Sequence, residues 1–330
     1  MAEVSLTNIS KAFGKTQAVD DITMTIEDGA FVVLLGPTGA GKTTTLRLIS
    51  GLEKLDSGTV KIGGRDVGGD TPAQRDVAMV FQQYSLYPHL TVRDNLAFPL
   101  RSPILKTPED VITEKVNKIA EVLQIPHKLG NKATELSGGE MQRVSIGRAL
   151  VRDPSIYLMD EPLSSLDAKL RADLRVELKR IHADLGSTLL YVTHDQIEAM
   201  TMASHIGVLE EGRLVQYGTP KEIYEDPRSV YVAGRLGLPR INILPVSLFP
   251  GDHKGTQIGL RPENIRQGDG IEATVIRAEH LGDHTRLHLD LQGHAITTLT
   301  DPHQAYAPNT TIKINPQSPL YFDASGARVV

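Results

Sequence analysis

The chain has 330 residues and no cysteine, with 35 lysine and arginine residues against 40 aspartate and glutamate residues. This length suggests about two domains. A content of 40% hydrophobic and 23% charged residues excludes collagen-like, disordered and disulfide-rich classes. The net charge of −5 gives no global attraction to nucleic acid or anionic lipid, and the lack of cysteine excludes thiolate metal sites and cysteine nucleophiles.

No membrane-spanning or secretory segment is predicted. The first residues, MAEVSLTNISKAFGK, lack the apolar segment of a secretory signal, and no run approaches the roughly 18 apolar residues of a membrane span. If the protein works at a membrane, we expect a partner to supply the span.

Four short apolar runs are typical of strands that are buried on both faces. They are Phe31–Leu35, Val77–Phe81, Ile156–Met159 and Leu189–Val192. Each run is too continuous for a strand with one wet face and too short for a buried helix. Helical patterns separate the runs, so the first two thirds of the chain is predicted to be an α/β unit with a largely parallel sheet.

Two helices are predicted between these strands. The first has Thr107 as its N-cap, Pro108 at the first helical position and Asp110 as the capping-box partner. The second is expected from about Ala168 to Leu185, with alternating charges on its exposed face.

The pattern changes at GRLGLPRINILP, residues 234–245, where glycine and proline interrupt the chain. Beyond this linker, Leu287, Leu289 and Leu291 alternate with polar residues, and Gly282–Asp283 and Gln292–Gly293 indicate tight turns. We therefore predict an α/β domain over residues 1–236, with a helical subdomain at about 90–150, and a small all-β barrel or sandwich over 237–330.

A glycine-rich segment follows the first apolar run and fits the pattern G-x-x-x-x-G-K-[ST]. Its residues are Gly36, Pro37, Thr38, Gly39, Ala40, Gly41, Lys42 and Thr43, and we include the adjoining Thr44 in the predicted binding segment. The glycines let successive N–H groups point inward at the start of a helix, which forms a cage for phosphate oxygens. Lys42 is predicted to reach the terminal phosphates and the Thr43 hydroxyl to coordinate Mg²⁺.

Asp160 and Glu161 follow the apolar run that begins at Ile156. This is the carboxyl end of a strand, where ligands bind in open α/β sheets. Asp160 is predicted to hold Mg²⁺, mainly through water, and Glu161 to polarise an attacking water as a general base. An Asp-Glu pair is common by itself, so this prediction depends on the phosphate loop.

A second helix start suited to an anion lies at Leu136-Ser137-Gly138-Gly139-Glu140. Ser137 can cap the helix with Glu140 as its box partner, and the two glycines leave the helix N-terminus bare. Such a segment alone is an ordinary N-cap, but here it adds to the helix start of the phosphate loop.

With these residues the chain resembles ATP-binding cassette (ABC) ATPases. Lys42, the LSGGE run at Leu136, Asp160–Glu161, Ser165–Asp167 and His194 occur in the family's order, and the match spans essentially residues 3–236. The resemblance implies a P-loop cassette of the ABC type that binds ATP and Mg²⁺ and pairs head to tail with a second copy of itself. Ser137 and Gly139, with Gly138 between them, would bind the γ-phosphate in trans, and Asp167 would lie in the loop that crosses the dimer interface.

The resemblance also implies roles for four separate residues. Phe13 would stack on adenine and Val19 would line the same pocket. Gln82 would contact Mg²⁺ and the attacking water, and His194 would contact the γ-phosphate. Taken alone, Phe13 is more typical of a core residue and His194 of an ordinary strand end, so both roles depend on the family's order of motifs.

Three further segments are similar to binding-protein-dependent importers of the maltose and glycerol-3-phosphate type. They are Val80–Val92, the HDQIEAMTMA run from His194, and Gly259–Glu263. The similarity implies carbohydrate uptake, an oligonucleotide-fold-like regulatory domain at the C-terminus, and a place on the cytoplasmic face of the inner membrane. Permease subunits would be contacted around Tyr84–His89, and a periplasmic solute-binding protein would be an indirect partner. The alternative is that Tyr84 and Tyr87 pack on the helical subdomain.

Other functions stay open at this point to different degrees. Polyamine, sulfate and ferric-ion importers have similar cassettes. A cassette protein of DNA repair or of ribosomes would usually show paired cassettes, heptad insertions or basic extensions, none of which is found here, so no nucleic-acid partner is expected. A GTPase would need N/T-K-x-D, and Asn131–Thr134 fails at its last position.

Histidines are concentrated beyond the linker. They are His253, His280, His284, His288, His294 and His303. Residues four apart on an extended chain are separated by roughly 13 Å, too far to share one ion, although His280 and His284 flank a predicted turn. We expect no metal site there.

Overall fold

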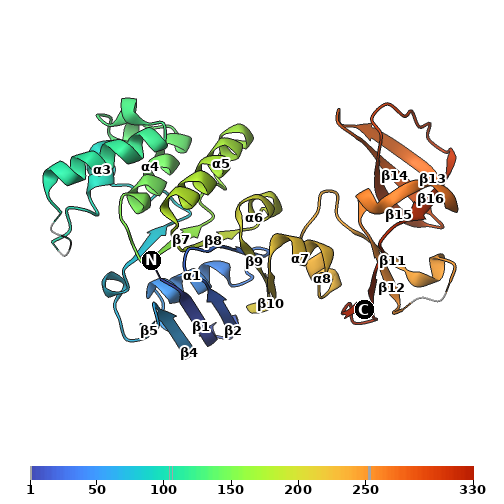
Figure 1. The fold of residues 1–330 in the computed structure, drawn as a ribbon, viewed down its shortest axis with the longest axis horizontal. Coiled ribbons are helices and arrows are strands. Elements are labelled where there is room, and N and C mark those ends of the chain that lie inside the picture. The colour runs from blue at the N-terminus through green and yellow to red at the C-terminus, as the bar shows by residue number, and fades with distance from the viewer. Residues whose placement is uncertain (1, 104, 106, 252–253) are drawn as a thin grey trace. The chain divides into compact units, whose positions relative to one another are not determined.

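The computed structural model describes residues 2–103, 105, 107–251 and 254–330. The chain divides into two compact units, Met1–Pro220 and Lys221–Val330, which are described separately (Figure 1). His253 lies outside the described residues. Residues 221–236 group with the C-terminal unit, whereas the sequence placed the boundary after residue 236. No helix in the described part of the chain has both the length and the apolar content that crossing a membrane requires.

A six-stranded sheet forms the centre of the first unit. In order across the sheet, its strands are β10 (Arg213–Gly218), β9 (His205–Glu210), β3 (Phe31–Leu35), β8 (Leu189–Thr193), β7 (Ile156–Asp160) and β6 (Val77–Val80). All neighbouring pairs are parallel except β9 with β10. The four apolar runs are therefore strands of one largely parallel sheet, as predicted.

One of those four strands is not interior. β6 lies at the edge of the sheet, and Val77 and Met79 are only half-buried. This corrects the expectation that all four runs are buried on both sides. The apolar composition of a strand reports burial of its faces, but it does not report whether a second strand pairs with its outer edge.

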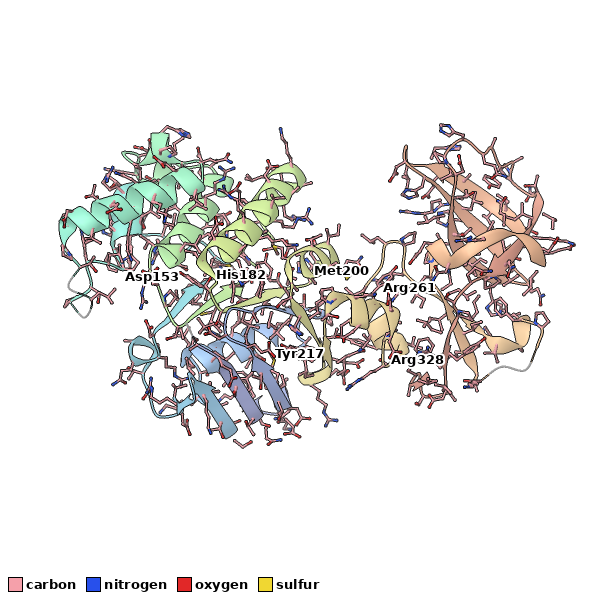
Figure 2. All side chains as sticks on the ribbon, in the orientation of Figure 1. Asp153, His182, Met200, Tyr217, Arg261 and Arg328 are labelled. Carbon is pink, nitrogen blue, oxygen red and sulfur yellow. The ribbon has the colours of Figure 1, made fainter. Side chains whose placement is uncertain are left out.

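The two faces of the sheet are covered by different helices. Phe31 of β3 points to one face, where its ring lies 5.1 Å from that of His182. Figure 2 labels His182. His182 belongs to α5 (Ala168–Leu185), and these bounds are the predicted ones. The helix starts after its N-cap Asp167 and ends at Gly186, which has a φ of 58°. The short helix α6 (Gln196–Met202) follows β8.

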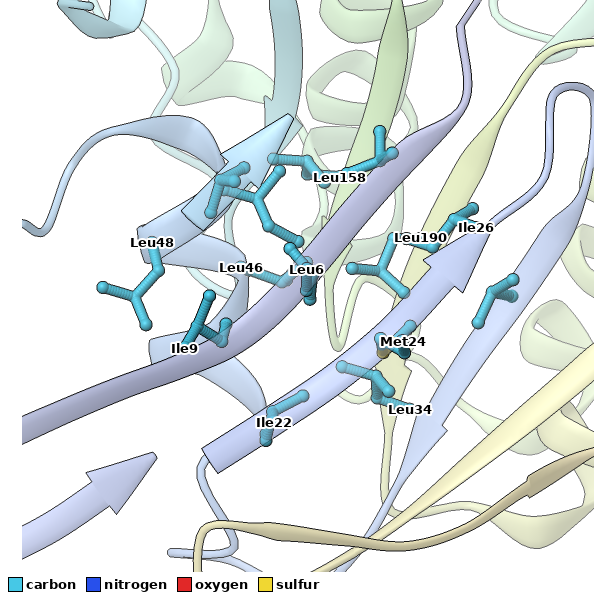
Figure 3. Packing of buried hydrophobic residues seen from close by; sticks show 14 of the residues in the cluster. Leu6, Ile9, Ile22, Met24, Ile26, Leu34, Leu46, Leu48, Leu158 and Leu190 are labelled. Atoms are coloured by element: carbon cyan, nitrogen blue, oxygen red, sulfur yellow. The ribbon is translucent and has the colours of Figure 1, made fainter. Parts of the chain in front are cut away.

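The opposite face holds the main core. There α1 (Lys42–Ser50) packs between the central sheet and an antiparallel sheet whose order is β2 (Thr16–Ile26), β1 (Val4–Phe13), β4 (Ser57–Ile62) and β5 (Arg65–Asp66). Figure 3 shows Leu34, Leu158 and Leu190 of the central sheet meeting residues of α1 and of the antiparallel sheet. The core therefore fixes the start of α1 against the carboxyl ends of the central strands.

A helical segment lies between β6 and β7. It contains α2 (Val92–Ala97), α3 (Glu109–Val122) and α4 (Gly138–Leu150). The start of α3 differs from the prediction: Pro108 rather than Thr107 is the N-cap, because its carbonyl accepts the first helical bond from Ile112 N–H at 3.0 Å and its ψ of 147° is extended. Short 3₁₀ turns lie at Pro72–Gln74, Pro126–Lys128, Ala133–Glu135, Val246–Leu248 and Pro262–Asn264.

The C-terminal unit is rich in strands. After α7 (Pro220–Glu225) and α8 (Val230–Ala233), one sheet runs β11 (Asn242–Pro245), β12 (Gln257–Leu260), β17 (Leu320–Phe322) and β18 (Arg328–Val329). The other runs β15 (His294–Thr300), β14 (Thr285–Leu291), β13 (Ile265–His280) and β16 (Thr311–Pro316). Leu287, Leu289 and Leu291 are fully buried on one face of β14, and tight turns lie on both sides of it, as predicted.

Candidate nucleotide-binding site

The glycine-rich loop joins the end of β3 to the start of α1. Gly39 and Gly41 have φ of 83° and 96°, in the region that favours glycine. A Cβ atom on Gly41 would lie 2.4 Å from the Ala18 carbonyl oxygen. Gly41 is also the N-cap of α1 without a side-chain cap, so the first N–H groups of the helix are left for an anion.

The predicted loop residues differ in exposure. Gly36, Ala40 and Lys42 are buried, whereas Thr38, Gly39 and Thr43 are exposed and Pro37 and Thr44 are half-buried. The Lys42 ammonium group donates to the carbonyls of Gly36 and Pro37 at 2.9 and 3.0 Å. The loop therefore curls around its own lysine.

Thr43 and Asp160 are brought together by the fold. The Thr43 hydroxyl donates to Asp160 Oδ1 at 2.9 Å, although the two residues are far apart in sequence. Burial raises the pKa of Asp160 above its ordinary value, while the hydrogen bond from Thr43 opposes that rise. A hydroxyl beside a carboxylate is a donor set that suits Mg²⁺.

Glu161 lies next to two cationic or potentially cationic groups. Its Oε1 is 3.5 Å from Lys42 Nζ, and its Oε2 is 3.0 Å from His194 Nδ1. The Glu161 backbone has φ 45°, which is strained for a residue with a side chain, and its N–H donates to the Val192 carbonyl at 3.0 Å. Three predicted residues, from α1 and from the ends of β7 and β8, therefore meet at one point.

Ser137, Gly138 and Gly139 lie at the start of α4. Among the described residues, no hydrogen bond or ion pair joins them to Lys42, Glu161 or His194. The Ser137 main-chain N–H and hydroxyl both donate to Glu140 Oε2, at 2.8 and 2.9 Å, which completes the predicted capping box. A Cβ atom on Gly139 would lie 2.6 Å from Leu170 Cδ2, so this turn packs against the beginning of α5, next to its cap Asp167.

Gln82 and Phe13 are exposed. Gln82 lines a groove with Tyr84 and Ser165, and no interaction among the described residues brings it to Thr43 or Asp160. The ring of Phe13 stands at the end of β1 with the Lys11 ammonium group 5.4 Å from its centroid.

Val19 does not line an open pocket. Its side chain is fully buried in the core with Ala40 and Leu46, which corrects the prediction from resemblance. Successive side chains of a strand point to opposite faces, so the half-buried Ala18, whose carbonyl adjoins Gly41, is the neighbour that faces the loop. Sequence reasoning missed Ala18, although the strand alternation around buried Val19 and Ile22 would have indicated it.

Asn95 is a second residue that sequence reasoning missed. It is fully buried, its Oδ1 accepts from Tyr87 N–H at 2.9 Å and its Nδ2 donates to the Tyr87 carbonyl at 3.1 Å. Asn95 thus fixes the loop that follows Gln82. The capping pattern Thr91-x-x-Asp94 at the start of α2 was the available signal that a helix holds this loop.

Comparison with known proteins decides the family. A model of the ABC transporter family matches residues 19–164, and a model of the TOBE domain matches residues 258–330. The maltose/maltodextrin import ATP-binding protein MalK of Escherichia coli strain K12 is 43% identical, over 88% of this chain and 86% of MalK. The chain belongs to the ATP-binding subunits of ABC transporters.

Other relatives agree with this membership. The sulfoquinovosyl glycerol transport ATP-binding protein SmoE of Agrobacterium fabrum is 41% identical over 100% of both chains. The dimeric bacterial ABC transporter cassette MJ0796 is 30% identical and superimposes with a TM-score of 0.60 over 66% of this chain and 98% of that one. The ABC subunit therefore has a P-loop cassette and a C-terminal, β-rich TOBE domain, and it is an ATPase that binds ATP.

Proposed function

We propose that this ABC subunit is the ATP-hydrolysing motor of an importer for a carbohydrate or a related solute. Support for the cargo class comes from its similarity to proteins of maltose/maltodextrin import and sulfoquinovosyl glycerol transport. The observation that carries the catalytic part is the meeting of Lys42, Glu161 and His194 beside the glycine-rich loop.

In the proposed complex, residues 36–44 wrap the phosphates of ATP. The free N–H groups at the start of α1 bind phosphate oxygens, and Lys42 leaves the carbonyls of Gly36 and Pro37 to bind the terminal phosphates. The exposed Phe13 stacks on adenine, with Ala18 in place of Val19 facing the nucleotide.

Hydrolysis depends on Glu161 as the general base. It orients a water molecule and accepts its proton as the water oxygen bonds to the γ-phosphorus and the bond to the bridging oxygen breaks, which gives phosphate and ADP. Lys42 Nζ lies 3.5 Å from Glu161 Oε1. Its transfer to the phosphates frees the carboxylate to act, while His194, held at Glu161 Oε2, contacts the γ-phosphate.

Mg²⁺ fits the pair formed by Thr43 and Asp160, which already present a hydroxyl and a carboxylate oxygen to one point. When bound, the ion supplies positive charge that offsets the charge of the phosphates. Gln82 is exposed, so it joins Thr43 and Asp160 as a ligand of Mg²⁺ only if it moves toward them.

We also propose a head-to-tail dimer of two subunits. Ser137, Gly138 and Gly139 of one copy bind the γ-phosphate held by the other copy, and Asp167 lies where the chains cross. Support comes from the dimeric state of the MJ0796 cassette and from Gly138 and Gly139, which follow the cap Ser137 in the first turn of α4 and carry no side chain that would block a phosphate. Hydrolysis removes the shared phosphate and opens the dimer.

The catalytic variant Glu161→Gln tests this scheme. It should keep ATP bound and, with Mg²⁺ and ATP, form a dimer that retains nucleotide, measured by light scattering and by nucleotide content after gel filtration. Lys42→Ala is the control and should bind no nucleotide. Normal turnover by the glutamine variant would remove Glu161 from the base role. A monomer at saturating Mg²⁺ and ATP, even with the membrane subunits present, would overturn the dimer.

A groove of about 570 Å³ is the proposed contact for a short helix of the permease. Tyr84, Leu86 and Met141 form part of its wall, and the Tyr84 hydroxyl donates to Ser165 Oγ at 3.3 Å. The ring of Tyr87 instead packs on the helical segment, 4.3 Å from the ring of Phe98. Of the predicted region Tyr84–His89, Tyr84 and Leu86 are therefore the apolar anchors that we propose.

The variant Leu86→Glu tests the groove, since a carboxylate there opposes insertion of an apolar helix. Reconstituted transport should fall about tenfold or more, equivalent to about 1.4 kcal/mol, while the ATPase activity of the isolated subunit is retained. Leu52→Glu, at an exposed leucine of the cassette, is the matched control and should transport normally. A parallel loss of ATPase activity and transport in the Leu86 variant would contradict the assignment.

We place the subunit at the cytoplasmic face of the inner membrane, with a periplasmic solute-binding protein as an indirect partner. Reconstitution with the membrane subunits, followed by uptake of maltose, a polyamine, sulfate or ferric ion, identifies the cargo. Uptake of one of the last three in place of sugar would replace the carbohydrate assignment and leave the ATPase mechanism intact.

A further inference from the structure

The C-terminal unit contains a pocket of about 440 Å³ that the proposed function does not use. Its lining residues come from the 3₁₀ turn at Pro262–Asn264, from β13, β15 and β16, and from the turn after β15. The volume lies in the range of roughly 300–1,000 Å³ that is usual for small-molecule sites.

The floor of the pocket is mainly apolar. Ile265, Thr298 and Ile314 are buried there. The Thr298 hydroxyl is bonded to the carbonyls of Pro262 and Ile265, at 3.0 and 2.8 Å. The half-buried Leu299, which also lines the pocket, is the apolar side chain that remains accessible above this layer, and the Thr298 hydroxyl is already satisfied.

The rim carries donors and acceptors. Glu263 and Asp301 provide carboxylates, Arg266 provides a guanidinium group, and Gln267 and Gln304 provide amides. All five side chains belong to exposed residues. One positive group against two negative groups makes the rim weakly acidic.

Hydrogen bonds hold one wall of this rim in place. Gln304 Nε2 donates to Gln267 Oε1 at 3.2 Å, and Gln267 Nε2 donates to the Tyr306 hydroxyl. The Tyr306 hydroxyl in turn shares a hydrogen bond of 2.9 Å with the Thr300 hydroxyl. Each amide uses only part of its bonding capacity in this chain, so the wall is ordered and still able to bind.

The chemistry of the pocket selects among ligand classes. Two carboxylates disfavour phosphate, sulfate and nucleotides because like charges repel. An apolar floor does not suit a metal cation, which requires oxygen ligands around it. A neutral molecule with several hydroxyl groups fits both parts. Its hydroxyls bond to the carboxylates, amides and guanidinium group, while its C–H face covers Leu299.

We propose that this pocket binds a neutral polyhydroxyl solute of the monosaccharide or disaccharide class. The site is separate from nucleotide binding and from the permease groove. The Glu263 carboxylate also accepts a hydrogen bond from the Tyr224 hydroxyl of α7, so a sugar hydroxyl that bonds to Glu263 shares or displaces that contact. Occupancy of the pocket is thereby linked to α7 within the same unit.

The test measures binding to the full chain by saturation-transfer NMR and calorimetry, with glucose, maltose and trehalose as probes and glucose 6-phosphate as the anionic comparison. The pocket variant combines Asp301→Asn with Gln304→Ala. The matched control combines Asp283→Asn with Gln317→Ala, the same residue types at exposed positions outside the lining. Thermal unfolding verifies that both variants are folded.

At least one neutral sugar should bind, and the pocket variant should weaken its binding about tenfold or more. Asp301→Asn replaces a charge-assisted hydrogen bond by a weaker neutral one, and Gln304→Ala removes another of about 1 kcal/mol. The control should bind like the unmodified chain. The proposal is overturned if no neutral sugar binds at tens of millimolar, if the pocket variant binds as well as the control, or if the phosphorylated sugar binds more tightly than the neutral ones. The assay uses neither ATP nor membrane subunits, so its failure leaves the proposed motor function standing.

Discussion

At the scale of single residues, Asp160 shows that the nucleotide site opposes the stability of the fold. The residue is 5% exposed, and burial raises the pKa of its carboxyl above the unfolded value, with the negative charge of Glu161 acting in the same direction and the Thr43 hydrogen bond against it. Because the folded pKa exceeds the unfolded one, the ionised carboxylate lowers the free energy of unfolding at neutral pH.

The substitution Asp160→Asn should therefore raise the melting temperature of the nucleotide-free protein at neutral pH. Asparagine keeps an acceptor for the Thr43 hydroxyl and removes the buried charge. The gain should shrink as pH falls through the folded pKa and should vanish below 3.8, the ordinary value. There Asp160 of the unmodified chain is protonated in both the folded and the unfolded state. Mg²⁺-dependent nucleotide binding should be lost in the same variant.

Scanning calorimetry at several pH values measures this prediction. Asp153→Asn serves as the control, since its ion pair with Lys115 is exposed and contributes little. A melting temperature below that of the unmodified chain would show that ionised Asp160 stabilises the apo fold.

At the scale of elements, the three helix starts at the site are built differently. α1 begins at Gly41 with no side-chain cap, whereas α5 begins at Asp167, whose carboxylate accepts from Leu170 N–H at 3.0 Å. α4 begins with a capping box in which Glu140 occupies the Ser137 N–H. Only the phosphate loop therefore leaves its first N–H groups without a capping side chain.

The capping box of α4 should weaken in acid. The hydrogen bond from Ser137 N–H, together with Lys128, lowers the pKa of Glu140 to about 2. Its contribution to stability is full above the ordinary value of 4.5 and is lost as pH falls from there to about 2. Glu140→Gln should cost about 1 kcal/mol near neutral pH and progressively less below pH 4.5.

Urea unfolding across this pH range measures the difference. Glu114→Gln, at an exposed position on α3, is the control and should show no such trend. A cost of Glu140→Gln that is independent of pH would mean that the Glu140 charge does not stabilise the helix start.

At the scale of the whole molecule, each compact unit has a core of its own. The cassette core includes Leu34, Leu46 and Leu190, and the C-terminal unit has separate clusters around Leu289 and Phe322. In the C-terminal unit the buried Arg261 (Figure 2) donates to main-chain carbonyls of Tyr224, Ala233 and Leu236. These bonds tie the segment 221–236 to the strands that follow it.

We expect two thermal transitions, one from each unit. Mg²⁺ and ATP should raise only the cassette transition, because ligand stabilises the unit that binds it. Arg261→Met should lower only the transition of the C-terminal unit, because it leaves buried carbonyls unpaired. We expect the free energy of unfolding of that unit to fall by about 2 kcal/mol. Calorimetry with and without nucleotide measures both effects, and Arg277→Met, at an exposed arginine, is the control. A single transition that shifts both with Mg²⁺ and ATP and with Arg261→Met would refute the expectation that the two units unfold independently.

Sequence alone determined those features that neighbouring residues encode. The glycine-rich loop, the order of the motifs and the bounds of α5 follow from local patterns, because an N-cap, a C-terminal glycine and helical periodicity act within a few residues. The alternation of Leu287, Leu289 and Leu291 likewise predicted a strand with one buried face.

Only the tertiary structure decided which side chains meet. It placed β6 at the sheet edge, Val19 in the core, and Tyr87 against Phe98. It also brought Lys42, Glu161 and His194 together from the ends of three elements. These contacts depend on strand order and on the direction in which each side chain leaves its strand. Both are set by packing between residues of different elements, such as Lys42 and Glu161, which no local pattern records.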